Sequence, residues 1–155
     1  MTAAVDTNVL IDLLTPGNVQ AAESRARLTE ASRLGALVIS EATYAELSGA
    51  FRDGEGLELF LDDTGVSLEP SSREALHRAG EAWVVYSRRR PRALTCARCG
   101  APQTVRCESC GETLRARQHL VADFLIGAHA LVHADRLLTR DRGFYATYFP
   151  DLELA

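Results

Sequence analysis

The stretch from Thr2 to Leu14, TAAVDTNVLIDLL, joins a short apolar strand directly to a helix. Residues 2–5 are small or apolar, as in a buried strand, and Asp6 ends the run. Residues 7–14 then read as a helix, which the Thr-Pro-Gly sequence at 15–17 stops. A strand that runs straight into a helix is the repeating unit of α/β proteins. The stretch therefore predicts an α/β fold with an acid at the carboxyl end of its first strand.

The same alternation of short strands and longer helices continues along the chain. Asn18 is expected to cap a helix that ends at Gly35, Ser40 to cap the helix that carries Glu46, and Ser71 with Glu74 to form a capping box. We expect further strands over residues 36–39, 66–68, 136–138 and 152–154, and helices over residues 18–34, 57–61, 71–90, 119–134 and 142–148, with a break at Gly54 and Gly56. This order predicts a three-layer α/β/α sandwich around a mostly parallel central sheet.

Bulk composition fits one ordinary globular domain. The chain has 155 residues, of which 46% are hydrophobic and 25% charged, and its net charge is −4. We expect a single domain over residues 1–155 that carries an inserted, arginine- and cysteine-rich loop at 91–117. The longest apolar run, at 121–134, is too short and too polar to span a membrane. No basic-then-apolar leader precedes Asp6, so we expect a cytoplasmic protein.

Four acids stand among small or apolar residues: Asp6, Glu46, Asp123 and Asp141. Asp6 and Asp141 each follow a predicted strand end, and such ends meet at one edge of a parallel sheet. Glu46 and Asp123 lie in helices that can cover that edge, and Gly127 is expected to leave room beside Asp123. Carboxylates gathered in this way repel one another unless a cation is bound. The pattern predicts a site for a hard divalent cation, Mg²⁺ or Mn²⁺.

Each acid taken alone also has a structural explanation. Asp6 and Asp141 are placed to cap the helices that follow them, Glu46 to lie on a helix surface, and Asp123 to pair with an arginine. The occurrence of all four together favours the metal site. Asp12, a turn and a half beyond Asp6, is expected to support helix packing or solvation instead.

Four segments of the sequence resemble a known family. They are VDTNVLIDLL at 5–14, YAEL at 44–47, ADFLIGAHA at 122–130 and LTRDRGF at 138–144. In this order and spacing they are similar to the PIN domain, and in particular to the VapC-type toxins of bacterial toxin–antitoxin pairs. The resemblance covers the chain from end to end except for the cysteine-rich loop. It implies a small α/β/α sandwich that acts as a metal-dependent endoribonuclease.

The resemblance also implies roles for individual residues. Asp6, Glu46, Asp123 and Asp141 would bind one or two Mg²⁺ or Mn²⁺ ions, while Asn8 and Thr139 would orient these carboxylates or the attacking water. We expect Asp6 and Asp141 to bind directly, and the other two acids to bind directly or through water. The implied partners are RNA as substrate, a small antitoxin that blocks the acidic cleft, and a second copy of the chain in a homodimer. Two alternatives stay open: an RNA-processing nuclease without an antitoxin, and a non-catalytic module that binds RNA or protein.

The four cysteines form two Cys-x-x-Cys-Gly sequences, at Cys96, Cys99, Cys107 and Cys110. Four thiolates at this spacing suit tetrahedral, structural Zn²⁺, and glycine permits a tight turn after each pair. Disulfides or a thioredoxin-like redox site are the alternatives, and a cytoplasmic location disfavours disulfides. The family as a whole has a short loop here, so this zinc knuckle departs from its pattern.

Eight arginines lie in and beside the inserted loop, with only two acids among them: Arg88, Arg89, Arg90, Arg92, Arg98, Arg106, Arg115 and Arg117. The loop enters just before the helix that bears Asp123. The arginines therefore either grip the RNA backbone beside the acidic site or are solvated on an insertion that zinc stabilises. Both interpretations stay open. His129 and His133, four residues apart on one helix, are expected to be core or surface residues, since their directions differ from that of Asp123.

Overall fold

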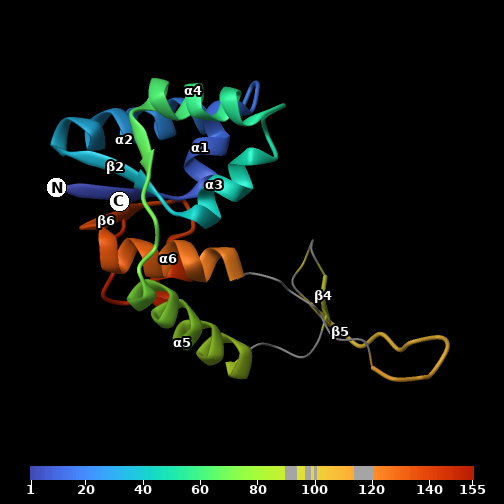
Figure 1. Ribbon diagram of the computed structural model, residues 1–155. Helices are drawn as coiled ribbons and strands as arrows, with labels where there is room; N and C mark the ends of the chain where they lie inside the picture. Colours follow the sequence, from blue (N-terminus) through green and yellow to red (C-terminus); the bar gives the residue numbers. More distant parts are fainter. Residues whose placement is uncertain (90–93, 97–98, 100, 114–120) are drawn as a thin grey trace.

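The computed structural model describes residues 1–89, 94–96, 99, 101–113 and 121–155. At its centre is a four-stranded sheet in which each strand pairs in parallel with its neighbours. Figure 1 shows the strands in the spatial order β3 (Val66–Leu68), β2 (Ala36–Ile39), β1 (Thr2–Val5) and β6 (Arg136–Leu138). The predicted parallel sheet is confirmed, and these four strands have the predicted bounds.

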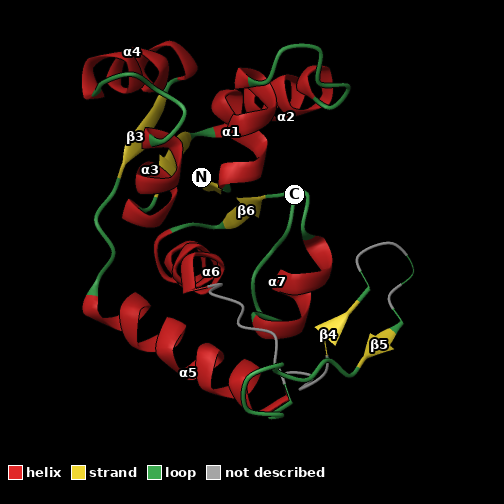
Figure 2. Ribbon diagram, turned by 90° about the vertical axis from the view of Figure 1, so that its right-hand side faces the viewer, coloured by secondary structure: helices red, strands yellow, loops and turns green. Residues whose placement is uncertain are grey.

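Helices cover both faces of the sheet and complete the three predicted layers (Figure 2). On one face lie α1 (Thr7–Leu14), α2 (Ala21–Leu34) and α4 (Gly54–Thr64), and on the other lie α5 (Arg73–Arg89), α6 (Val121–His133) and α7 (Arg142–Tyr148). The remaining helix, α3 (Glu41–Ser48), follows the carboxyl end of β2 and contacts both α1 and α6.

The strands are apolar on both sides because both sides are covered. In β2, Leu37 and Ile39 belong to the core under α1, α2 and α4, while Val38 belongs to the core under α5, α6 and α7. In β1, Ala4 faces the second core, which is rich in aromatic residues. Small residues on β1 allow helices to pack closely on the middle of the sheet.

Helix starts depend on which polar side chain is free to act as a cap. Ser40 caps α3 as predicted, since its Oγ accepts a hydrogen bond from the backbone N–H of Thr43. The predicted start of α2 at Asn18 is wrong, because the helix begins at Ala21. The Asn18 side chain accepts a hydrogen bond from the Gln20 N–H and forms a turn before the helix.

The predicted capping box of Ser71 and Glu74 is also replaced by another arrangement. Ser72 Oγ accepts a hydrogen bond from the Ala75 N–H at 3.2 Å, so the adjacent serine caps α5. Ser71 instead donates both its N–H and its hydroxyl to Glu41, at the start of α3. Two neighbouring serines offer equivalent caps in the sequence, and a contact between distant segments decides between them.

Two further predictions are wrong. The break at Gly54 and Gly56 is absent, because both glycines lie in the first turn of α4, where Asp53 accepts a hydrogen bond from the Gly56 N–H. The predicted final strand at 152–154 is reduced to a single parallel bridge between Leu137 and Leu154.

Gly127 has a different role from the one expected. A Cβ at this position would lie 2.4 Å from the Phe149 ring, so the space above Gly127 is filled by that ring. The glycine therefore permits close packing of α6 against the C-terminal segment and does not leave room beside Asp123.

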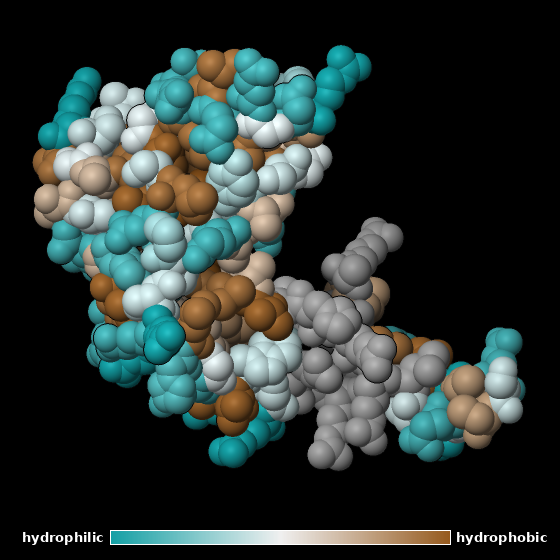
Figure 3. Space-filling model, in the orientation of Figure 1, coloured by the Kyte–Doolittle hydropathy of each residue, from teal (hydrophilic) through white to brown (hydrophobic). Residues whose placement is uncertain are grey.

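The described part of the inserted loop consists of two short hairpin structures. β4 (Leu94–Thr95) pairs antiparallel with β5 (Pro102–Gln103), and an isolated antiparallel bridge joins Arg106 to Thr113. Figure 1 shows these hairpins beyond the end of α5, outside the helix layers. In the space-filling view the described part of the loop shows both hydrophilic and apolar atoms at its surface (Figure 3). Val105 is among the exposed apolar residues.

Among the described residues, no helix has the length and apolar character required to cross a membrane.

Candidate active site

The four predicted acids lie at the edge of the sheet where the strands end. Asp6 follows β1, and its N–H donates to the carbonyl of Leu138 at the end of β6, at 3.0 Å. Asp141 precedes α7 and Asp123 lies in the first turn of α6. Glu46 lies in α3, the helix that begins at the carboxyl end of β2. Parallel strand ends thus bring together acids that are more than a hundred residues apart in the chain.

Electrostatic interactions show that the four carboxylates share one region. The pKa of Asp123 is raised to about 6, first by burial and then by the negative charges of Asp6, Glu46 and Asp141. Burial also raises the pKa of Asp6, and the charge of Glu46 acts in the same direction. Among the described residues, no Arg or His side chain forms an ion pair with any of the four acids. The site is an uncompensated acidic cluster.

Asp6 is held in place by the two predicted polar neighbours. Its Oδ2 accepts hydrogen bonds from Asn8 Nδ2 at 2.5 Å and from the Thr139 hydroxyl at 2.6 Å. The Thr139 hydroxyl in turn accepts from Asn8 Nδ2 at 3.2 Å and from the Asp141 N–H at 3.0 Å. Asn8 and Thr139 therefore fix one oxygen of Asp6 and tie the end of β1 to the loop that bears Asp141.

The other acids have partners from the start of a helix. The Thr7 hydroxyl, next to Asp6, donates to Glu46 Oε2. Asp141 Oδ1 accepts a hydrogen bond from the Phe144 N–H at 3.1 Å and so caps α7, as the structural explanation of this residue required. Asp6 occupies the corresponding position before α1, yet its side chain makes no capping hydrogen bond. Thr7 was not among the predicted site residues.

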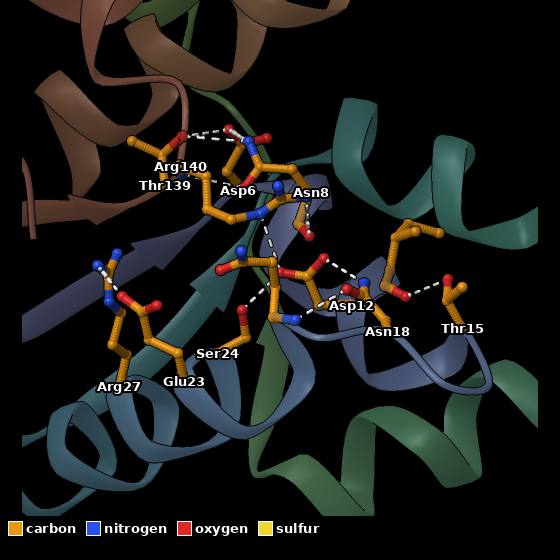
Figure 4. A network of polar contacts seen from close by, with 12 residues as sticks. Asp6, Asn8, Asp12, Thr15, Asn18, Glu23, Ser24, Arg27, Thr139 and Arg140 are labelled. Atoms are coloured by element: carbon orange, nitrogen blue, oxygen red, sulfur yellow. Dashed lines mark hydrogen bonds and ion pairs between the residues drawn. The ribbon is translucent and has the colours of Figure 1, made fainter.

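Asp12, which is buried, and Arg140, which is partly exposed, form an ion pair beside Asp6 and Asn8 (Figure 4). Asp12 is 1% exposed, and its Oδ2 lies 2.9 Å from Arg140 Nε. Ser24 donates to the same carboxylate at 2.6 Å and Asn18 at 2.7 Å. Asp12 thus supports packing between α1, α2 and the loop after β6, as expected, and it binds the arginine that adjoins Asp141 in the chain.

Tyr145 is a second residue that the sequence did not point to. Its side chain is 1% exposed, and its hydroxyl is buried without a hydrogen bond of regular geometry to any described residue. The hydroxyl nevertheless lies close enough to Asp6 to lower the pKa of that carboxyl. The pKa of Tyr145 is raised strongly, first by burial and then by the charges of Asp6 and Asp123. In the sequence Tyr145 reads as a core aromatic residue of a short helix.

The donor set fits a hard divalent cation. The four carboxylates offer oxygen ligands, and burial with mutual repulsion raises the pKa values of Asp6 and Asp123. Among the described residues, no guanidinium group pairs with these acids. A bound Mg²⁺ or Mn²⁺ ion would relieve the charge repulsion. As the side chains stand in the described residues, no three His, Cys, Asp or Glu groups are close enough together to hold a metal ion. Binding therefore requires side-chain adjustment within the cluster.

The first cysteine of each pair makes the same type of backbone hydrogen bond in the inserted loop. The Cys96 N–H donates to the Ala101 carbonyl at 2.9 Å, and the Cys107 N–H donates to the Glu112 carbonyl at 2.8 Å. The backbone N–H groups of Cys110 and Ser109 lower the pKa of the Cys107 thiol. Backbone donors directed at sulfur favour the thiolate, which is the form that binds metals.

The predicted basic residues are described only in part. Arg88 and Arg89 are exposed in the last turn of α5. Arg106 NH1 donates to the Gly111 carbonyl at 3.2 Å, so this guanidinium supports the second hairpin. The other five lie outside the described residues: Arg90, Arg92, Arg98, Arg115 and Arg117.

His129 and His133 lie away from the acidic cluster, on the C-terminal half of α6. Their rings stack with centroids 4.8 Å apart. His133 pairs with Glu69, and His129 contacts the Ser71 hydroxyl at 3.1 Å through Nδ1. The Nε2 of His129 is buried without a partner in the described residues, so this core histidine is only half satisfied.

Comparisons with known proteins support the fold. No family model matches the sequence, and no curated protein matches it. Among solved structures, the chain is similar to one in VapBC2 from Rickettsia felis bound to a promoter DNA fragment, with 17% identity, a TM-score of 0.62, and coverage of 100% of this chain and 98% of the other. It is similar to one in VapBC-1 from nontypeable Haemophilus influenzae, with 21% identity, a TM-score of 0.63, and coverage of 100% and 97%. A chain of FitAB bound to an IR36 DNA fragment matches with 15% identity, a TM-score of 0.58, and coverage of 99% and 93%. The match extends over the full length and shows that the chain has the fold of the PIN-domain toxins.

Proposed function

We propose that this chain is a divalent-metal-dependent endoribonuclease and the toxin of a toxin–antitoxin pair. The observation that carries the proposal is the uncompensated cluster of four carboxylates at the carboxyl ends of β1 and β6, in a fold shared with VapC and FitB. The charged forms of Asp6 and Asp123 are unfavourable in the fold, because burial and the neighbouring negative charges raise the pKa values of both carboxyls.

Each residue of the cluster has a definite part in this proposal. Asp6 and Asp141 would hold Mg²⁺ or Mn²⁺ directly, and Glu46 and Asp123 would bind directly or through water. The bound ion supplies a polarised phosphate and a more acidic water for hydrolysis of the phosphodiester bond. Asn8 and Thr139 keep Asp6 Oδ2 in place through two donors, and they would thereby orient the carboxylate that holds the ion.

Cleavage of total RNA with and without Mn²⁺ tests the proposal. The wild-type chain should release fragments with defined ends only when Mn²⁺ or Mg²⁺ is present. Asp6→Asn should abolish this cleavage and the growth arrest caused by expression. Asp62→Asn makes the same chemical change at an exposed position on α4 and should leave cleavage unchanged. Cleavage that persists in Asp6→Asn would exclude metal-dependent catalysis through that residue and favour the non-catalytic binding module.

We also propose an antitoxin and a homodimer, both from the resemblance to VapC-type toxins. A short gene directly upstream that encodes a DNA-binding protein, and co-purification of its product with this chain, would support the pair. Cleavage without any such partner would favour the alternative, an RNA-processing nuclease. Size-exclusion chromatography with light scattering measures the mass of the assembly, and a monomer would exclude the homodimer.

The inserted loop is proposed to bind one structural Zn²⁺ through Cys96, Cys99, Cys107 and Cys110. Support comes from the spacing of the two pairs and from the matching backbone hydrogen bonds, Cys96 N–H to the Ala101 carbonyl and Cys107 N–H to the Glu112 carbonyl. Metal analysis of the purified protein should give one zinc per chain, and Cys107→Ser should lose it while Ser109→Ala retains it. A mass lower by about two hydrogens per cysteine pair, with no zinc, would establish the disulfide alternative instead.

Contact of the arginine-rich segment with the RNA backbone is proposed as well. Each phosphate contact by an arginine steepens the salt dependence of binding. RNA affinity measured against salt for the wild type and for Arg88/Arg89/Arg90→Ala should therefore give a shallower slope in the variant. An unchanged slope would show that the arginines are solvated on a zinc-stabilised insertion.

A further inference from the structure

The hydroxyl of Tyr145 is unusual because it is buried and lacks a regular partner in the described residues. A buried hydroxyl without a hydrogen bond destabilises the folded state. A phenylalanine in its place would keep the ring contacts with Phe144 and Phe149, whose centroids lie 5.1 and 6.4 Å away. Packing therefore explains the ring of Tyr145 and leaves its oxygen unexplained.

The position of the oxygen relates it to the acidic cluster. Tyr145 lies one turn after Asp141 on α7, which packs with α6 on the same side of the sheet (Figure 2). Its phenol interacts with the charges of Asp6, Asp123 and Asp141, and these charges with burial keep its pKa far above the ordinary range. The group is therefore protonated, and toward these carboxylates it acts only as a hydrogen-bond donor.

Asp6 is the acid of the cluster whose pKa the Tyr145 hydroxyl lowers. Its Oδ2 already accepts from Asn8 and Thr139, both of which approach from the β1 and β6 loops. A third donor from the core side would restrain the carboxylate in the remaining direction. A metal ligand held by several outer donors keeps the orientation that coordination needs.

We propose that Tyr145 is a positioning residue, whose hydroxyl donates to the Asp6 carboxylate and holds it in the orientation that binds a divalent ion. This inference rests on the proposed metal site. The residue does not touch RNA or the reacting atoms, and it acts through Asp6. The hydroxyl makes no hydrogen bond of regular geometry within the described residues, and we expect the bond to Asp6 to form when an ion binds.

Calorimetric titration of the full chain with Mn²⁺ tests the inference through binding rather than activity. Tyr145→Phe should weaken Mn²⁺ affinity by about 10- to 100-fold, as loss of an outer donor does in other metal sites. Its metal-free form should unfold at the same or a higher urea concentration than the wild type, because an unsatisfied hydroxyl has been removed. Tyr148→Phe, the same change three residues later on α7, should leave both quantities unchanged.

The outcomes separate this inference from the proposed function. Unchanged Mn²⁺ affinity in Tyr145→Phe overturns it, and so does a loss of affinity accompanied by an equal loss of metal-free stability, which would assign the hydroxyl a structural role. If the wild type binds Mn²⁺ but cuts no RNA, the proposed function fails while the comparison of affinities still decides the role of Tyr145. If the wild type binds no Mn²⁺, the metal site and the inference fail together.

Discussion

The acidic cluster should make the metal-free protein less stable at neutral pH than in mild acid. Asp123 carries the largest numerical shift in the cluster, because its pKa rises from the ordinary 3.8 to about 6. A group whose pKa is raised by folding binds its proton more tightly in the folded state. Its contribution to stability is therefore fully present below about pH 4 and is lost as the pH rises through about 6.

The size of the effect follows from the pKa difference. Roughly two pH units correspond to about 3 kcal/mol, at ~1.4 kcal/mol for each unit. Asp123 is only half-buried, so solvent screening reduces this to about 1–2 kcal/mol. In Asp123→Asn the side chain is uncharged at every pH, so the variant does not lose stability through ionisation at this position. Without metal, the variant should match the wild type near about pH 4 and exceed it by about 1–2 kcal/mol near about pH 7.5.

Urea unfolding in the presence of EDTA measures this difference at both pH values. Asp62→Asn, an exposed control on α4, should change the free energy of unfolding by less than about 0.5 kcal/mol. With saturating Mn²⁺ at neutral pH, the wild type should be more stable than Asp123→Asn, since metal binding stabilises the wild type and not the variant. A wild type that equals or exceeds Asp123→Asn at neutral pH without metal would refute the claim that these carboxylates repel one another.

Three further predictions concern the framework around the site and are measured by urea unfolding. Gly127→Ala places a Cβ 2.4 Å from Phe149 and should cost about 1–3 kcal/mol by overpacking, whereas an unchanged midpoint would contradict the close contact. Arg140→Ala leaves the Asp12 carboxylate buried without its cation and should lower the free energy of unfolding by about 1–3 kcal/mol. The loss should be smaller than for a fully buried pair, because Arg140 is 43% exposed. An unchanged free energy of unfolding would mean that the hydrogen bonds from Ser24 and Asn18 are enough to stabilise the Asp12 carboxylate. Ser40→Ala removes the cap of α3 and should cost about 1 kcal/mol, with no loss expected if another group replaces the hydroxyl.

The sheet was predictable because its signals are local. Residues 2–5 and 36–39 are apolar throughout, as strands buried on both faces must be, and each ends at a polar residue that starts a helix. Helix starts were less predictable, because they depend on contacts between distant segments. The Asn18 amide is drawn to Asp12, and the Ser71 hydroxyl is drawn to Glu41, so neither serves as the expected cap.

Some residues of the candidate site could also be predicted from the sequence, and others could not. Asp6 and Asp141 could be predicted, since parallel pairing places the ends of β1 and β6 side by side. Thr7 and Tyr145 could not, because a threonine in a first turn and an aromatic residue in a short helix are common for reasons of packing alone. Their relation to the carboxylates exists only after α3 and α7 have packed against the sheet.

The pair of Asp12 and Arg140 explains how an acidic cluster persists beside an arginine. Arg140 adjoins Asp141 in the chain, and an unrestrained guanidinium there would pair with the nearest carboxylate of the cluster. Asp12, one helical turn after Asn8 on α1, lies 2.9 Å from Arg140 Nε, and the Arg140 backbone N–H donates to Asn8 Oδ1 at 3.2 Å. The same residue that could neutralise the site is thereby used to brace Asn8, which in turn orients Asp6. The charge of Asp12 is thus balanced by Arg140, while the four acids of the cluster keep their negative charge at the proposed cation site.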